Sequence, residues 1–452
     1  MADSPDPLEL LRSKGYLFLL VVAALIGAPI SAIAYFYLEL INWLQHELYE
    51  RLPTGLGFAG TPAWWPVPLL VVSGLVVGLV VRYLPGRGGH SPADGFKMGG
   101  GPPLPIDVPG VALASIATLA LGAVLGPEAP LIAIGGGLGA LTVHLVKSDA
   151  PPMATVVIAG AGSFAAISTL LGNPLAGAFL LMEAVGLGGP LLGMVLVPGL
   201  LASGIGYMVF TGLNSWTGFG TFSLSIPNLA HLPAPTIAEL GWAVVIGVGA
   251  TVLGGVIRWT ALFVRPFVER NLVLFTPLAG AAVAGIAIAF AEGTGQSYAA
   301  VLFSGQNELA PFTAHAASWS VGALVAVVVC KGAAYGISLS SFRGGPIFPS
   351  LFIGAAGGIA LSHLGGLPMV AGMAMGIGAM STVMLKLPLT SVLVASLLVA
   401  SAGSSTIPLI IVAATVAYVG SAYFAPVPAN AGKATELMEE APAAAASPAP
   451  VT

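Results

Sequence analysis

The stretch "AVLGPEAPLIAIGGGLGALTV", residues 123–143, holds one charged residue, Glu128, in a run of otherwise uncharged and mostly apolar side chains. A Gly-Pro pair, Gly126 and Pro127, comes directly before this acid. Proline is tolerated in the first turn of a helix, because its missing N–H would have no partner there. The pair therefore predicts that a helix begins at this point, with a carboxylate in its first turn.

The composition of the whole chain agrees with a membrane environment for this helix. Of its 452 residues 57% are hydrophobic, and only 7% are charged. Soluble domains are about one quarter charged. Apolar runs recur along nearly the whole length, and a helix needs about 20 apolar residues to cross a bilayer. We expect an all-α polytopic protein of the plasma or inner membrane, surrounded by lipid.

Charge and cysteine content exclude several classes of protein. The net charge of −4 and the lack of a basic stripe argue against a nucleic-acid partner. Cys330 is the single cysteine, so no intramolecular disulfide is possible. Neither Cys nor His residues have the spacing of metal ligands, and we expect neither metal nor cofactor. Arg12 and Lys14 precede the first apolar run, which predicts a cytoplasmic N-terminus.

The order of apolar runs predicts two halves. We expect a cytoplasmic segment over 1–15, a first membrane repeat over 16–211, a connecting loop over 212–236, a second membrane repeat over 237–425 and a disordered Ala/Pro-rich tail over 426–452. The first apolar run is too long for a helix perpendicular to the membrane, so it should be tilted. Several others are short and broken by Gly or Pro, which is typical of discontinuous helices that line a transport site.

An internal repeat supports the division. "GPEAPLIAIGGGLG" (126–139) aligns without gaps with "GPIFPSLFIGAAGG" (345–358). The identical pairs are Gly126/Gly345, Pro127/Pro346, Pro130/Pro349, Ile134/Ile353, Gly135/Gly354 and Gly139/Gly358. Further on, "LGNPLAG" (171–177) aligns with "LKLPLTS" (385–391). Two proline-anchored blocks in the same order favour a duplication over chance matches in a Gly-rich chain. The repeat alone leaves open whether the halves are parallel or inverted.

Each repeat thus supplies one helix start, at Glu128 and at Ile347 and Phe348. The first N–H groups of a helix carry the positive end of its dipole and bind anions without Lys or Arg. If the two starts face each other they form an anion site, and Glu128 competes with the anion for it. The alternative is that Glu128 reaches water or is protonated in the core. Carboxylates at the middle of the membrane cost about 2.5–3.5 kcal/mol and usually serve a function.

On these motifs the chain resembles the CLC family of chloride channels and chloride/proton antiporters. "GPEAP" (126–130) is similar to the motif that carries the family's external gating glutamate, which places Glu128 in that role. "GPIFP" (345–349) and, more weakly, "GGGPP" (99–103) are similar to two further family motifs. The resemblance implies an inverted-repeat fold and a homodimer that conducts chloride or a similar small anion. The anion-binding residues that it implies are Gly100, Gly101, Ile347, Phe348 and Asn430.

Departures from the family pattern bear on mechanism. Gly100 stands at the family serine, and Pro346 lacks the N–H of its counterpart. The family tyrosine has no clear match in "YFAPVPANAGK" (423–433): Tyr423 is one alternative, and Asn430 is our expectation. Antiporters of the family carry an internal proton-transferring glutamate, where this chain has Ala184, although Glu183 precedes it. We therefore favour a passive channel. The alternative is an antiporter whose proton path uses Glu128 and Glu183.

Two other functions were weighed. A membrane-embedded enzyme would use Glu128 or Glu183 as acid or base, but no catalytic motif accompanies them, and we expect no enzyme. A cation transporter would use Glu128 as a ligand, and its flux would follow the cation. Lys331 and Arg343 flank the end of the apolar run before the second Gly-Pro pair. They either create a positive field along the anion path or anchor helices at the membrane interface, and we favour anchors.

Overall fold

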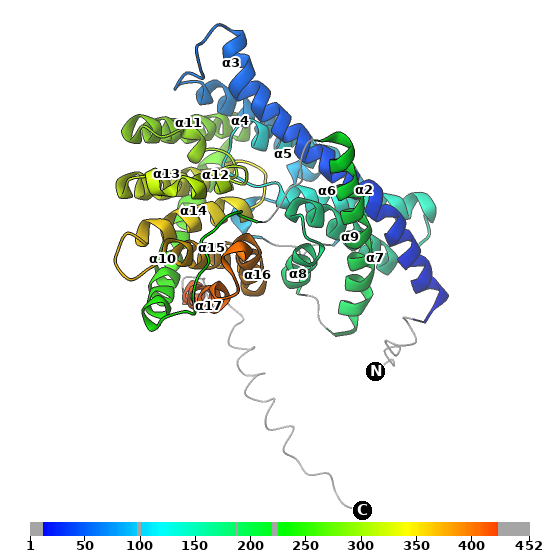
Figure 1. Ribbon diagram of the computed structural model, residues 1–452. Coiled ribbons are helices and arrows are strands. Elements are labelled where there is room, and N and C mark those ends of the chain that lie inside the picture. Colours follow the sequence, from blue (N-terminus) through cyan, green and yellow to red (C-terminus); the bar gives the residue numbers. More distant parts are fainter. Residues whose placement is uncertain (1–11, 97–100, 187–188, 219–224, 424–452) are drawn as a thin grey trace, which may run out of the picture.

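The computed structural model describes residues 12–96, 101–186, 189–218 and 225–423 (Figure 1). These residues are arranged as packed helices without a named β-strand. Within them, nine helical segments are long and apolar enough to cross a membrane. The expected all-α, multi-pass architecture is therefore confirmed.

The first half begins with a long helix, α2, which crosses the molecule diagonally in Figure 1. Its 33 residues span about 50 Å at 1.5 Å per residue, more than the hydrocarbon thickness of a bilayer. Short helical turns follow α2, including α3 (Leu52–Gly55). The main helices of this half are α2 (Lys14–His46), α4 (Pro66–Tyr83), α5 (Val108–Ala120), α6 (Glu128–Val146), α7 (Pro152–Leu171), α8 (Pro174–Val185) and α9 (Gly189–Thr217).

The second half repeats the helix order of the first. Its helices are α10 (Ile237–Arg270), α11 (Leu272–Thr294), α12 (Leu309–Ala314), α13 (Val321–Ser341), α14 (Ile347–Leu361), α15 (Met369–Leu385), α16 (Pro388–Leu398) and α17 (Thr406–Tyr423). The packing is also repeated: α6 lies on α7 as α14 lies on α15, and α2 on α9 as α10 on α17. One boundary differs from the prediction, because α9 continues to Thr217 instead of ending at residue 211.

Glycines set the close helix packing in both halves. A Cβ atom added to Gly135 of α6 would collide with the carbonyl oxygen of Gly162 of α7. In the second half, a Cβ atom on Gly354 of α14 would collide with the carbonyl oxygen of Gly376 of α15. Small residues allow such close backbone contact between membrane helices. Gly135 and Gly354 are repeat partners, so the duplication extends to the packing of the core.

The two halves run in opposite directions. The end of α2 lies beside the start of α4, where the Trp65 indole N–H donates to the carbonyl of Leu48 at 2.8 Å. After α4 has crossed the molecule, Asp94 forms an ion pair at 2.6 Å with Arg265, close to the end of α10. Helix α10 therefore ends on the face opposite the end of α2. The equivalent helices α2 and α10 are antiparallel, which confirms the inverted repeat.

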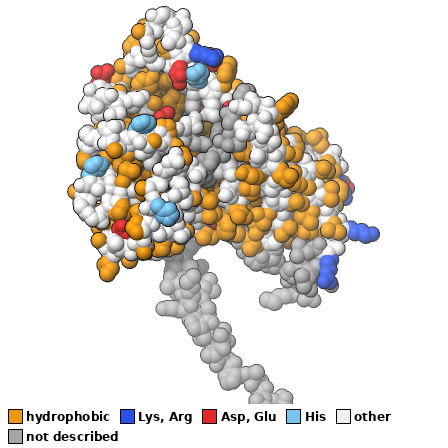
Figure 2. Space-filling view, viewed as in Figure 1, with side chains coloured by type: hydrophobic (Ala, Val, Ile, Leu, Met, Phe, Trp, Pro, Cys, Tyr) orange, Lys and Arg blue, Asp and Glu red, His pale blue; other side chains and the backbone are white. Residues whose placement is uncertain are grey.

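The exterior of the molecule is largely apolar. Figure 2 shows hydrophobic side chains dense over the right-hand part of the visible surface and mixed with other side chains on the left, with few charged side chains overall. Leu25 of α2 is 70% exposed, and Met208 of α9 is 74% exposed. Such a surface is typical of a protein whose helices face lipid. The starts of α6 and α14 do not reach this surface, because their first residues are buried in the interior.

Candidate anion site

Both Gly-Pro turns begin helices. Helix α6 starts at Glu128 with Pro127 as its N-cap, and α14 starts at Ile347 with Pro346 as its N-cap. Neither N-cap side chain accepts a hydrogen bond from the helix. The first N–H groups of each helix are therefore available for a partner from elsewhere. The helix starts expected from the sequence are confirmed.

The two turns are bonded directly to each other. The Gly126 N–H donates to the Gly345 carbonyl at 2.7 Å, and the Gly345 N–H donates to the Gly126 carbonyl at 2.5 Å. This isolated antiparallel bridge joins two residues that are partners in the sequence repeat. It places the positive ends of α6 and α14 next to each other in the interior.

Glu128 occupies the start of the opposite helix. Its side chain is fully buried, and its Oε1 atom accepts the Phe348 N–H of α14 at 2.9 Å. A carboxylate in this position is stabilised by the positive end of the α14 dipole. Its other oxygen, Oε2, has no hydrogen-bond partner among the described residues. The carboxylate thus fills the start of α14, but one of its oxygens has no partner among the described residues.

The glycines of the turns make room for this carboxylate. A Cβ atom on Gly126 or on Gly345 would collide with the carboxylate oxygens of Glu128. Neither glycine is needed for an unusual backbone angle, since neither has a positive φ. Close approach is therefore the physical reason for glycine at both positions. The glycine of each pair leaves space for the carboxylate, and the proline is the N-cap at which the helix begins.

Cavities reach both turns, and two of them are lined by the chain neighbours of Glu128. A cavity of about 440 Å³, which we call the polar cavity, lies beside the end of α2 and reaches Pro127. A second cavity of about 390 Å³, which we call the apolar cavity, reaches Ala129, Pro130, Gly344 and Pro346. Glu128 lies between Pro127, which lines the polar cavity, and Ala129, which lines the apolar cavity. The buried carboxylate of Glu128 therefore belongs to a turn that has a cavity next to each of its two chain neighbours.

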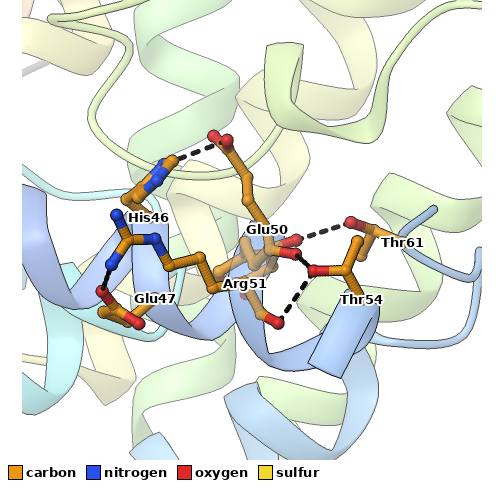
Figure 3. A network of polar contacts seen from close by, with 7 residues as sticks. His46, Glu47, Glu50, Arg51, Thr54 and Thr61 are labelled. Atoms are coloured by element: carbon orange, nitrogen blue, oxygen red, sulfur yellow. Dashed lines mark hydrogen bonds and ion pairs between the residues drawn. The ribbon is translucent and has the colours of Figure 1, made fainter. Parts of the chain in front are cut away.

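Charged residues at the end of α2, of which His46 and Glu50 line the polar cavity, form local pairs (Figure 3). His46 Nδ1 lies 3.0 Å from a carboxylate oxygen of Glu50, and Arg51 lies 2.6 Å from Glu47. These pairs are largely exposed, so each contributes little to stability. Tyr298 lines the same cavity, and burial raises the pKa of its hydroxyl, which therefore stays neutral. The lining of this cavity is polar and includes two acidic residues, Glu50 and Glu308.

Three of the expected anion-binding residues lie in the described part of the chain. Ile347 and Phe348 form the start of α14 and are buried. Gly101 has a φ of +88° and lines the apolar cavity together with Pro346. Gly100 and Asn430 lie outside the described residues.

Glu183 has a different setting from Glu128. Its carboxylate accepts the backbone N–H groups of Leu389 at 3.0 Å and Thr390 at 2.7 Å, and the Thr390 hydroxyl at 2.6 Å. These donors lie in the first turn of α16, so Glu183 of α8 caps a helix of the other repeat. None of the hydrogen bonds among the described residues joins Glu183 to Glu128.

Lys331 and Arg343 are not interfacial anchors, which corrects our preference. Lys331 is fully buried, and its ammonium donates to four successive carbonyls, of residues 300–303, at 2.9–3.3 Å. Arg343 is 9% exposed and donates to the carbonyls of Arg87 and Phe342. The sequence did not reveal that loops fold back into the interior and offer carbonyls to these cations.

Sequence reasoning missed two polar side chains of α13. Tyr335 is fully buried, and its hydroxyl donates to the Pro346 carbonyl at 2.9 Å. The Ser338 Oγ atom accepts the Val124 N–H at 3.2 Å, just before the first Gly-Pro turn. With Lys331, these residues recur at the i, i+4, i+7 spacing of one helix face. Polar residues at that spacing within an apolar run were the sequence signal that could have indicated a polar face on this helix.

Two opposed helix starts around one carboxylate, between two cavities of an inverted-repeat membrane bundle, define a carrier or channel for small anions. Comparison with known proteins identifies the group. Residues 73–421 match the model of the voltage gated chloride channel family. The chain belongs to this family, and its transport is of the CLC anion type. The family and its solved relatives are ion transporters or channels.

Similar proteins agree with this assignment. "Putative ion-transport protein YfeO" of Salmonella newport (strain SL254) is 29% identical over 363 residues, which cover 79% of this chain and 84% of that protein. A slow cyanobacterial Cl⁻/H⁺ antiporter of known structure superposes with a TM-score of 0.73 at 19% identity, covering 91% of this chain and 95% of the other. A CLC-type fluoride/proton antiporter gives 0.68 at 18% identity, covering 90% and 96%. These structural likenesses establish the shared fold.

Proposed function

We propose that the protein moves chloride or a similar small anion across the membrane, with Glu128 as the gate. One observation carries this proposal: Glu128 Oε1 accepts the Phe348 N–H at 2.9 Å. The carboxylate takes the place that a free anion would occupy at the start of α14. The backbone amides and helix dipoles can hold the anion without a basic side chain, as at other helix starts.

Opening requires the Glu128 side chain to leave the α14 start. Protonation weakens its hold, because a neutral carboxyl gains less from the helix dipole and from the Phe348 N–H. An arriving anion competes for the same amides of Ile347 and Phe348. After displacement, the anion passes between the polar and apolar cavities through the position that the carboxylate has left. Gly100, Gly101 and Asn430 are proposed to contribute further contacts along this path.

We favour passive conduction over proton-coupled exchange. The position of the family's internal glutamate is Ala184, and the adjacent Glu183 is engaged as a cap by three donors of α16. These three hydrogen bonds hold the Glu183 carboxylate at the start of α16. The alternative is a chloride/proton antiporter, in which protons reach Glu128 by another route. Sustained proton pumping driven by a chloride gradient in liposomes would contradict the channel.

We propose that the polar cavity opens to the outside. Lys14, Arg82, Lys147 and Arg270 stand at helix ends on the face where α2 begins. By the positive-inside rule this face is cytoplasmic. The polar cavity lies at the other end of α2.

We further expect a homodimer in the plasma or inner membrane, with one anion path in each subunit.

The test is flux from liposomes loaded with chloride, bromide, nitrate or fluoride, with pH recorded at the same time. Glu128→Ala and Glu128→Gln should raise anion flux about tenfold, the effect of removing one charge-assisted hydrogen bond, and abolish its pH dependence. Glu239→Gln is the matched control, because Glu239 is also buried but belongs to the capping box of α10. Unchanged flux and pH response in Glu128→Ala would rule out this gate.

The same liposomes separate anion transport from cation transport. Replacing potassium by a large organic cation should leave the rate unchanged, whereas replacing chloride by gluconate should stop it. A rate that follows the cation instead would assign Glu128 the role of a cation ligand.

A further inference from the structure

Tyr335 is a buried hydroxyl next to the anion site that the proposed gate does not use. It lies in α13, is fully buried and donates to the Pro346 carbonyl at 2.9 Å. Pro346 is the N-cap of α14, directly before the amides of Ile347 and Phe348. Pro346 also lines the apolar cavity. The phenol therefore lies against the residue at which the cavity meets the helix start.

Helix α13 holds both Gly-Pro turns through one face. Ser338 accepts the Val124 N–H ahead of the first turn, and Tyr335 donates to Pro346 in the second turn. One helical turn away on the same face, Lys331 is fixed by four carbonyls. The position of the phenol is thus set by a helix that is anchored on both sides of it. A fixed phenol can turn only its O–H bond, about the C–O axis.

The residues of the two turns offer the anion few side-chain donors. Gly126, Pro127, Gly345, Pro346 and Ile347 have none. The Tyr335 hydroxyl comes from a different helix and carries one hydrogen, which now lies on a carbonyl. An anion at the α14 start is a stronger acceptor than that carbonyl, because hydrogen bonds to charged groups are roughly twice as strong as neutral ones.

We propose that Tyr335 is a selectivity-determining residue for the transported anion. When Glu128 leaves the start of α14, the Tyr335 hydroxyl turns from the Pro346 carbonyl to the anion that replaces the carboxylate. This inference rests on the proposed function of the site. A small, strongly hydrated anion such as chloride loses more hydration than thiocyanate on entry and depends more on donors that replace water. The phenol therefore favours chloride over thiocyanate.

The test compares chloride and thiocyanate flux in liposomes for the full chain and Tyr335→Phe. Both are also measured with Glu128→Ala, so that the gate does not limit the rate. Loss of the donor should lower the chloride-to-thiocyanate ratio about tenfold, the lower end of the range for a hydrogen bond to a charged group. The ratio does not depend on how much protein folds. Tyr37→Phe is the matched control, because Tyr37 is 8% exposed and bonds to Ser115 at 2.6 Å, away from both turns.

Each result has one meaning. A lower ratio in Tyr335→Phe with an unchanged ratio in Tyr37→Phe supports the inference. An unchanged ratio in Tyr335→Phe overturns it while leaving anion transport intact. If Tyr335→Phe fails to fold while Tyr37→Phe folds, the hydroxyl serves the fold and the inference is again overturned. If the unmodified chain carries no anion flux, the proposed function itself fails.

Discussion

The start of α6 and the start of α14 are built from the same Gly-Pro turn, but their first helical residues differ. At α6 this residue is Glu128, and at α14 it is the buried Ile347. The carboxylate of Glu128 in the first turn accepts the N–H of Phe348 in the second. The apolar side chain of Ile347 cannot make the reciprocal bond to the start of α6. A symmetric backbone thus carries an asymmetric charge. The duplication supplies both helix starts, and a single position, Glu128, supplies the carboxylate that we propose as the gate.

The largest effect is expected from Gly345→Ala, because the added Cβ atom would collide with the Glu128 carboxylate. We expect a loss of about 3 kcal/mol in the free energy of unfolding, as for overpacked cores. Thermal unfolding in detergent measures this loss. Glu128→Ala in the same chain should restore part of it. Gly357→Ala is the control within α14, since its Cβ atom would meet only a Val328 methyl group, at 4.0 Å. Equal losses in both backgrounds would show that the carboxylate is not the obstacle.

A second asymmetry lies in α13. Lys331 corresponds by the repeat spacing to Ala112 of α5, so only the second half carries a buried ammonium at this position. Lys331→Met should cost about 2 kcal/mol, because four buried carbonyls lose their donor. Lys386→Met should change stability by less than about 0.5 kcal/mol, since Lys386 is exposed. If the two variants unfold at the same temperature, the carbonyls have found another partner.

The N-terminus of α8 is capped by a residue next to it in the chain, whereas that of α16 is capped by a residue of the other repeat. Glu183 caps α16 from the other repeat, through three hydrogen bonds. Glu183→Ala should cost about 1.5 kcal/mol, the value of hydrogen bonds to a charged group at a partly exposed site. Chemical unfolding detects this loss. Proton movement during anion flux should be unchanged in the same variant. A change in proton movement would instead place Glu183 on a proton path.

The smallest effect is expected at the local cap of α8. Asn173 Oδ1 accepts the N–H groups of Leu175 at 2.9 Å and Ala176 at 3.1 Å, within its own helix. Asn173→Ala should cost about 1 kcal/mol, the usual value of an N-cap. Comparing this loss with that of Glu183→Ala shows whether a cap supplied across the repeats is stronger than a local one. Anion flux should remain at the level of the unmodified chain.

The sequence predicted the fold and the helix starts at the two Gly-Pro turns because both depend on local patterns. Gly-Pro pairs before apolar runs mark helix starts whatever surrounds them, and both predicted starts are present. The repeat of Gly126 and Gly345 indicated that the turns are equivalent. It did not indicate that they bond to each other, because a bridge between distant residues leaves no periodic signal.

The side chains around the site were less predictable. Lys331 was assigned to the membrane interface, since a lysine near a helix end usually reaches water. Its burial depends on carbonyls of residues 300–303 that point inward, which composition does not show. Tyr335 was overlooked because tyrosine is common in apolar helices. Only its contact with Pro346 distinguishes it.

The bond from Phe348 to Glu128 joins residues separated by 220 positions in the chain. At synthesis rates of 5–20 residues per second, roughly 10–40 s pass between the appearance of one partner and that of the other. During this time the first half is already in the membrane with its carboxylate but without the amides that hold it. The anion site that we propose needs both helix starts, so it can form only after the second half has been inserted.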